Sequence, residues 1–284
     1  MMRNAARSAS REPTLLSAPL ELKGNWGAPL EGPAAIVVSR MREACLSGLS
    51  LLSDHQPGKL IIDNRSAGGA APPPPQSQAE QPSVRLQVEQ PRTAWIIVTV
   101  GERDWSRLAY QFGHELGHVL CNSWERSAAP QIPCQWIEEA LVEAFSIRGL
   151  AALADEWERN VPFPGQEAFA GSIRKYRSDL VGKYRRRARE LGATLDMGEF
   201  FRTHRAALEA NLGVSPKTAG AVFGFLSELE QSSAYMEDMG ALNRWPARSA
   251  VPVEKYLGLW EKSCLEIKTP GLLPKRLRDL LQLG

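Results

Sequence analysis

The spacing of hydrophobic residues predicts a short mixed segment of helix and strands, followed by a long helical segment. Between residues 33 and 52 apolar side chains recur at helical spacing, which predicts an amphipathic helix that ends before Pro57. Three β-rich runs follow and predict strands: LIID near residue 60, VRLQVEQ near 84–90, and AWIIVTV at 94–100.

The second and third of these runs differ in their pattern. VRLQVEQ alternates apolar and polar residues, which predicts a strand with one exposed face, whereas AWIIVTV predicts a strand buried on both faces. The stretch 64–83, rich in Gly, Ser and Pro, predicts a long flexible loop between the first two strands.

Two segments near the middle of the chain, 104–121 and 135–150, are apolar on nearly every face and predict core helices. Asp104 is expected to cap the first of them. Beyond about residue 152 the strand pattern disappears, and the spacing predicts only helices, at 166–191, 196–211, 216–231, 233–243 and 252–264.

This order of elements indicates an α+β fold. We expect a disordered leader at residues 1–20, a compact core at 21–152 that contains the small mixed sheet and the two core helices, and an all-helical C-terminal subdomain at 153–284.

Composition excludes few classes of protein but narrows the location. The formal net charge of the 284 residues is +2, so no whole-molecule field favours nucleic acid or membrane. The N-terminal segment is rich in Arg, is broken by prolines and lacks an export signal, and no run of about 18 apolar residues occurs. We therefore expect a cytoplasmic protein without a membrane span.

The four cysteines form no CxxC pair and are expected to be buried thiols in a reducing compartment. Cys121 and Cys134 flank the loop between the two core helices, so an oxidised form that staples this loop is the alternative.

The candidate chemistry lies in the sequence HELGH on the first core helix. Residues i and i+4 lie about 40° apart around a helix, so His114 and His118 share one face and can bind one metal ion. Glu115 is rotated by about 100° from His114, which places its carboxylate beside a metal-bound water and not on the metal.

A catalytic zinc site needs a third protein ligand in addition to a water. Glu139 lies 139 − 118 = 21 positions after His118, on a helix that is otherwise almost entirely apolar. Buried carboxylates need partners, so we assign Glu139 to the metal and Glu143, four residues later, to the outer N–H of His114. Glu138 competes with Glu139 for the ligand position, but it points about 100° away from it.

HELGH followed by WIEEALVE resembles the gluzincins, a group of zinc metallopeptidases that includes thermolysin and the zinc aminopeptidases. The resemblance covers roughly residues 84–150 and implies a zincin-like catalytic core with one Zn²⁺. Ala140 stands where the aminopeptidases usually have glycine, and their GxMEN signature is missing before HELGH, so an aminopeptidase is not indicated.

The resemblance implies hydrolysis of peptide bonds in a peptide or protein substrate. In such enzymes zinc polarises the scissile carbonyl, and the glutamate base, here Glu115, takes a proton from the attacking water and passes it to the leaving amine. A further donor beside the metal stabilises the developing charge, and the candidates are His204, Tyr176 and Tyr184. Zincins also pair the substrate with a sheet edge, for which VRLQVEQ is the natural candidate. The helical subdomain would then form the far wall of the active-site cleft.

Two other functions stay open. The zinc site could belong to a catalytically silent interaction or regulatory module, although a purely structural zinc commonly has four protein ligands and has no use for Glu115. Eight Lys and Arg residues between 174 and 189, with two tyrosines among them, could contact nucleic acid, but a solvated helix face is the more common meaning of such a run.

Overall fold

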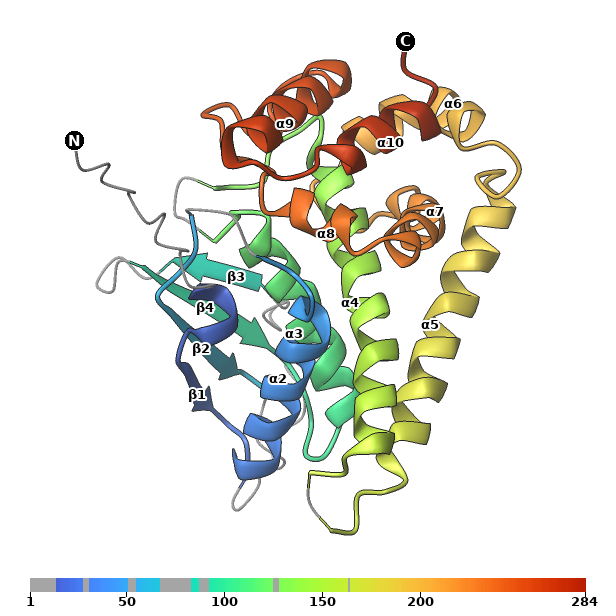
Figure 1. Ribbon diagram of the computed structural model, residues 1–284. Coiled ribbons are helices and arrows are strands. Elements are labelled where there is room, and N and C mark those ends of the chain that lie inside the picture. The colour runs from blue at the N-terminus through green and yellow to red at the C-terminus, as the bar shows by residue number, and fades with distance from the viewer. Residues whose placement is uncertain are drawn as a thin grey trace, which may run out of the picture.

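A computed structural model describes residues 14–27, 31–50, 55–66, 83–86, 92–124, 128–162 and 164–284. It shows a mixed fold that is mostly helical, with a small sheet on one side and helices stacked beside it (Figure 1). Within these residues no helix has both the length and the apolar character needed to cross a bilayer.

The sheet has the strand order β1-β2-β4-β3. Strands β1 (Leu20–Gly24), β2 (Lys59–Asn64) and β4 (Thr93–Val98) are parallel, and β3 (Ser83–Leu86) is antiparallel to β4 at one edge. β2 and β4 are almost wholly buried, which explains the uninterrupted apolar runs 60–62 and 94–98 within them. The three predicted strands are confirmed in position, although residues 87–90 of the second lie outside the described residues.

Strand β1 was not predicted, and the prediction of a disordered leader was wrong for residues 14–20. Helix α1 spans Thr14–Ser17, and the buried Leu15 donates its backbone N–H to Gln56 Oε1 at 2.7 Å. The sequence of β1, LELKG, is short and carries two charges because it forms a half-exposed edge, and such a strand leaves a weak pattern. The predictions for residues 1–13 and for most of the 64–83 loop lie outside the described residues.

Helix α4 (Gln135–Arg159) is the central element of the helical part. It packs against α2 (Glu31–Leu46) and α3 (Trp105–Leu120) on the side of the sheet, and against α5 (Phe169–Glu190) and α7 (Thr218–Gln231) on the other side (Figure 1). The boundary expected near residue 152 falls inside this helix, and the buried apolar residues of both halves form one cluster. The two parts of the chain therefore share α4.

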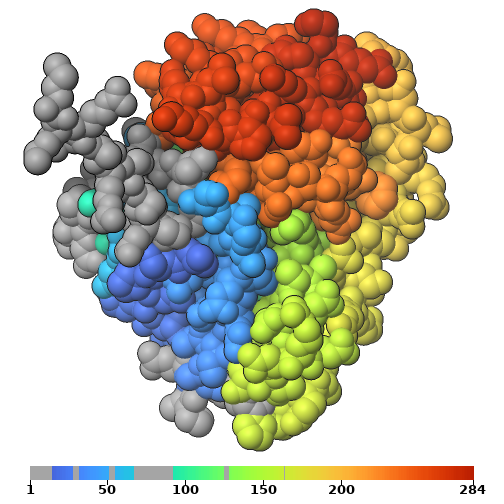
Figure 2. All heavy atoms as spheres, in the orientation of Figure 1, coloured from blue at the N-terminus to red at the C-terminus, as the bar shows by residue number. Residues whose placement is uncertain are grey.

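The C-terminal part contains six helices within the described residues: α5 (Phe169–Glu190), α6 (Met197–Glu209), α7 (Thr218–Gln231), α8 (Ala234–Met239), α9 (Val253–Ile267) and α10 (Leu272–Leu280). In the space-filling view the C-terminal segment, in red, lies directly against the preceding helices, in orange (Figure 2). The buried Asp238 carboxylate holds this arrangement, since it accepts the backbone N–H groups of Gly271, Leu272 and Leu273 at the start of α10.

Three local predictions need correction. Helix α2 ends at Leu46 and not near residue 52. Asp104 stands at the N-cap of α3, but its side chain accepts no capping hydrogen bond. Helix α10 was not predicted, since Pro274 within its first turn interrupts the helical pattern, although proline is tolerated there.

Two glycines of α3 allow close contact with α4. A Cβ on Gly113 would lie 2.8 Å from Ser146 Oγ, and a Cβ on Gly117 would lie 2.8 Å from Val142 Cβ. Because Gly113 and Gly117 are four residues apart, as are Val142 and Ser146, both pairs lie along one helix contact. The glycines thus bring the α4 glutamates within reach of the α3 histidines.

We expect Gly117→Ala to destabilise the protein by about 1–3 kcal/mol, because the added methyl group overpacks this contact. The measurement is the free energy of unfolding in denaturant. Gly171→Ala is the matched control: Gly171 is exposed on α5 with open space around its Cβ position, so its free energy of unfolding should change by less than about 1 kcal/mol. Equal effects of the two changes would contradict the packing argument.

Candidate metal centre

Three side chains converge between α3 and α4. The ligand atoms of His114, His118 and Glu139 all lie within 4.8 Å of one another. His114 Nε2 is 3.8 Å from Glu139 Oε2, and His118 Nε2 is 3.8 Å from Glu139 Oε1. The side chains are 16%, 11% and 12% exposed, so the group is largely buried but still reached by solvent. This group could bind a metal ion.

The hydrogen bonds fix the tautomer of both imidazoles. His114 Nδ1 lies 2.8 Å from Glu143 Oε2, and His118 Nδ1 lies 2.6 Å from Glu138 Oε1. An ionised carboxylate can only accept, so each Nδ1 carries a proton, and each Nε2, on the side of Glu139, is the nitrogen that would bind a metal ion once it is deprotonated. Neutral imidazoles with a hydrogen-bonded outer nitrogen are what a metal site requires. The residues present therefore fit a metal ion.

Two distances between candidate ligand atoms also agree with those expected around a zinc ion. Two ligand atoms at about 2.0–2.1 Å from a zinc ion are about 3.4 Å apart at the tetrahedral angle. The 3.8 Å separations in the structure are within a few tenths of an ångström of this value. For these two pairs of ligand atoms, only a small contraction would be needed around an ion.

Glu143 makes the predicted contact with His114, and two tyrosines hold it in place. Tyr110 of α3 and Tyr184 of α5 both donate their hydroxyl groups to Glu143 Oε1. Burial alone would raise the pKa of the Glu143 carboxyl, but the bonds from His114 and the tyrosines outweigh it and lower this pKa. Glu143 is therefore an ionised support for His114.

Glu138 does not join the ligand group, so the alternative assignment is corrected. Its carboxylate lies behind His118, where Oε1 accepts from Nδ1, and Oε2 accepts from Asn243 Nδ2 at 2.7 Å. Burial opposes ionisation of Glu138, but the bond from His118 is strong enough to lower its pKa. Each imidazole is thus backed by its own buried carboxylate.

The third candidate ligand has a support as well. Gln135 Nε2, one turn before Glu139 on α4, donates to Glu139 Oε1 at 3.3 Å. Gln135 Oε1 accepts from Ser249 Oγ at 3.3 Å. Ser249 belongs to the segment between α8 and α9, so the C-terminal part of the chain contributes to this support.

Glu115 differs from the other glutamates of the site. It is 2% exposed, and no described residue donates a hydrogen bond to its carboxylate. Burial raises the pKa of Glu115, while the two histidines partly offset this rise. A buried carboxylate with a raised pKa and no partner is suited to accept and release a proton.

The site without a cation is rich in negative charge. Burial would lower the pKa of His118, but Glu139 and Glu138 overcome this effect and raise it to about 10. The pKa of His114 is raised in the same way, against the effect of burial, chiefly by its bond to Glu143. The carboxylates therefore favour positive charge at this position, which a divalent cation would supply.

The three candidates for a further donor lie at different places relative to the metal centre. His204 packs against the ring of Phe200 on α6, with Lys217 and Arg187 as its nearest charges, and α6 lies well away from α3 (Figure 1). Tyr176 packs against Tyr110 with ring centroids 5.8 Å apart. His204 therefore does not lie at the site. Tyr184 is connected to the site through its hydrogen bond to Glu143.

Several residues of the site were not predicted. Tyr110 lies four residues before His114 on the same helix face, so helical spacing alone could have found it. Gln135 could have been found in the same way from Glu139. Asn243 and Ser249 lie 100 or more residues beyond the glutamates, and no local pattern connects them to the site.

The remaining predictions concern the cysteines and the basic segment. All four cysteines are free and buried, and Cys134 Sγ donates to Val251 O at 3.0 Å. Much of the basic charge on α5 is paired: Arg174 with Asp155 and Glu158, Lys175 with Asp179, Arg177 with Glu230, and Arg187 with Glu190. Contact with nucleic acid was the less favoured alternative, and it stays untested.

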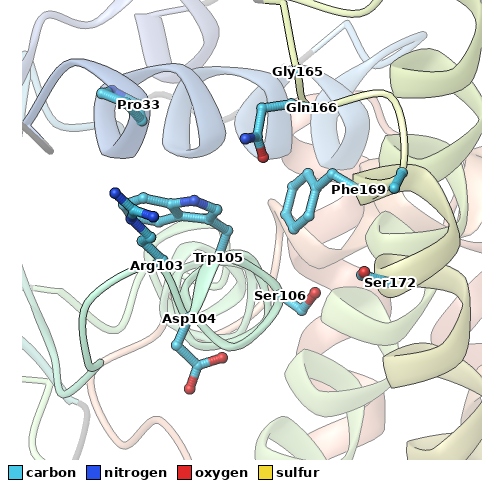
Figure 3. A pocket seen from close by; sticks show the side chains of 10 residues that line it. Pro33, Arg103, Asp104, Trp105, Ser106, Gly165, Gln166, Phe169 and Ser172 are labelled. Atoms are coloured by element: carbon cyan, nitrogen blue, oxygen red, sulfur yellow. The ribbon is translucent and has the colours of Figure 1, made fainter.

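A cavity of about 480 Å³ lies elsewhere, at the start of α3. Figure 3 shows Trp105 and Phe169 on either side of it, while the Asp104 carboxylate points away. His114 is nine residues beyond Trp105, about 13 Å along the helix axis. The cavity is therefore separate from the metal centre.

Comparisons with family models, with curated proteins and with solved structures gave no match for this chain. Support for a function therefore comes from the geometry of the centre itself.

We expect the purified protein to bind one divalent metal ion, with zinc as the first ion to try, and Glu139→Ala to lose this binding. A ligand that binds only the folded state raises the stability by RT ln(1 + [L]/Kd), so zinc at 100 times Kd should add about 2.7 kcal/mol to the wild type. The measurements are metal content after dialysis and the melting temperature with and without zinc. Equal zinc stabilisation of wild type and Glu139→Ala would contradict this ligand set.

Proposed function

We propose that this protein is a zinc-dependent peptidase of the gluzincin kind. The observation that carries the proposal is the position of Glu115. It is buried and without a partner among the described residues, and it directly follows one of two histidines whose Nε2 atoms face the carboxylate of Glu139.

Zinc is proposed because of the donor set. Two imidazoles and one carboxylate are a common protein contribution to a catalytic zinc site, which keeps one position for water or substrate. No cysteine belongs to the group, whereas structural zinc sites commonly contain cysteine and four protein ligands. The small sheet with α3 and α4 would then form a zincin-like core.

Glu115 is the proposed general base and acid. A bound zinc ion would supply Lewis acidity toward a carbonyl oxygen and a water. Glu115 accepts a proton from the water as its oxygen forms a bond to the carbonyl carbon. The same carboxyl then delivers this proton to the amide nitrogen as the C–N bond breaks, which releases a carboxylic acid and an amine.

Support for a peptide substrate comes from the sheet. β3 is the edge strand next to β4, and α3, which carries both histidines, packs against β3 and β4. An extended peptide that pairs with an edge strand gains main-chain hydrogen bonds without a specific sequence. A peptide along β3 would run beside α3, the helix that carries both histidines.

The rival proposal of a catalytically silent zinc module has less support. Such a module needs His114, His118 and Glu139 and their hydrogen-bonded supports. It has no need for a fourth buried carboxylate without a partner, because burial of an unpaired charge costs stability. Glu115 is therefore the residue that separates the two proposals.

We expect Glu115→Gln to retain zinc and to lose peptide cleavage by about 10²–10⁴-fold, since general acid–base catalysis contributes about this much. The measurement is digestion of a mixed peptide library, followed by mass spectrometry, beside metal analysis of the same sample. Glu102→Gln, at an exposed turn before α3, is the control and should cleave like the wild type. Equal cleavage by Glu115→Gln and wild type would refute the assigned base, and a zinc-loaded wild type that cleaves no peptide would favour the silent module.

A further inference from the structure

Asn243 connects the C-terminal half of the chain to the metal centre. It is 2% exposed and lies in the segment between α8 and α9 with a left-handed backbone, φ 58°. Asparagine is one of the few residues other than glycine that adopt this conformation readily. Its side chain is the group that meets the second carboxylate oxygen of Glu138.

The neighbours of Asn243 fix the orientation of its amide. The hydroxyl of the buried Tyr256 on α9 donates to Asn243 Oδ1 at 3.1 Å. The Nδ2 group therefore faces Glu138 Oε2 at 2.7 Å, with Ser123 Oγ at 3.1 Å and Cys121 O at 3.3 Å as further acceptors. The reverse orientation would place a carbonyl oxygen against a carboxylate, so this one is strongly favoured.

We propose that Asn243 is a positioning residue of the metal centre and acts on His118 through Glu138. Tyr256 orients the amide of Asn243, Asn243 holds one oxygen of Glu138, and the other oxygen holds His118 Nδ1 at 2.6 Å. His118 Nε2 is then directed at the position that Glu139 also faces. The inference rests on metal binding at this centre and does not depend on peptide cleavage.

The physical basis is the isolation of Glu138. The residue is 1% exposed, so water cannot replace a lost protein donor at low cost. Without Asn243 Nδ2, the carboxylate would keep only the side-chain hydrogen bonds from His118 and Ser123 to set its rotation about the final side-chain bond. His118 would then lose the fixed orientation of its ring, and outer partners of this kind typically contribute about 10–100-fold to metal affinity.

Asn243→Asp is the sharpest test, because it changes one NH₂ group to an oxygen and keeps the size and the backbone preference. The new carboxylate would face Glu138, so we expect zinc affinity to fall by at least about 10-fold at constant pH. Tyr256→Phe removes only the outer hydroxyl group and should lower zinc affinity by a smaller factor. Asn160→Asp, the same chemical change at an exposed position at the end of α4, should leave zinc affinity unchanged.

The readouts are zinc affinity by competition with a chelator and the visible absorption spectrum of the Co²⁺-loaded protein, which reports on the ligand geometry. Circular dichroism without metal shows whether each variant folds. A folded Asn243→Asp with wild-type zinc affinity and an unchanged Co²⁺ spectrum overturns the proposal. If Asn243→Asp does not fold, Tyr256→Phe decides: an altered Co²⁺ spectrum with reduced zinc affinity supports the proposal, and wild-type values overturn it.

The outcomes also separate this inference from the proposed peptidase function. A wild type that binds zinc but cleaves no peptide leaves the role of Asn243 intact. A wild type that binds no divalent metal overturns both the positioning role and the zinc centre.

Discussion

Three glutamates on α4 lie buried against two histidines on α3, and the rest of the centre follows from the need to compensate their charge. Glu138, Glu139 and Glu143 are each less than 10% exposed. An unpaired carboxylate at such a position would cost several kcal/mol, so each needs donors or a cation. Glu138 and Glu143 obtain donors from the outer nitrogens of the histidines and from residues behind them. Glu139 has a single long hydrogen bond from Gln135, and it faces the two remaining imidazole nitrogens.

The packing of α3 on α4 is what allows this compensation. A side chain at Gly113 or Gly117 would collide with Ser146 or Val142 of α4 and would oppose the close approach that keeps the carboxylates within hydrogen-bond range of the imidazoles. The same spacing repeats on both helices: histidines at i and i+4 on α3 face glutamates at i and i+4 on α4. Close approach and matched spacing together convert two helix faces into one site, and neither is sufficient alone.

Much of this was predictable from the sequence because it is local. His114, His118, Glu139 and Glu143 are related by helical spacing, and a carboxylate on an apolar helix indicates a buried partner. The helical spacing gave the direction of Glu138, about 100° from Glu139. Its partner, His118 Nδ1, was not identified, because the spacing within one helix gives no information about contacts with another helix. β1 and α10 were missed because a short edge strand with charges and a helix with an early proline lack a regular pattern.

The contribution of the C-terminal half could not be predicted, since it depends on contacts between residues far apart in the chain. This half provides Tyr184 behind Glu143, Asn243 behind Glu138, and Ser249 behind Gln135. Each of the three candidate ligands is therefore hydrogen-bonded to a residue that in turn accepts a hydrogen bond from a different residue of the helical half.

These contacts cross the boundary that was expected near residue 152 between the core and the helical subdomain. A core that ended there would contain every candidate ligand, and it would also contain Glu138, Glu143 and Gln135. It would lack Tyr184, Asn243 and Ser249, each of which donates to one of these three residues, and it would cut α4 before its end at Arg159. Two buried carboxylates would lose hydrogen bonds at the same time as the apolar face of α4 lost its cover from α5 and α7. The cost of exposing that face and the cost of leaving the carboxylates without donors act on the same helix, so the fold of the C-terminal half and the geometry of the centre stabilise each other.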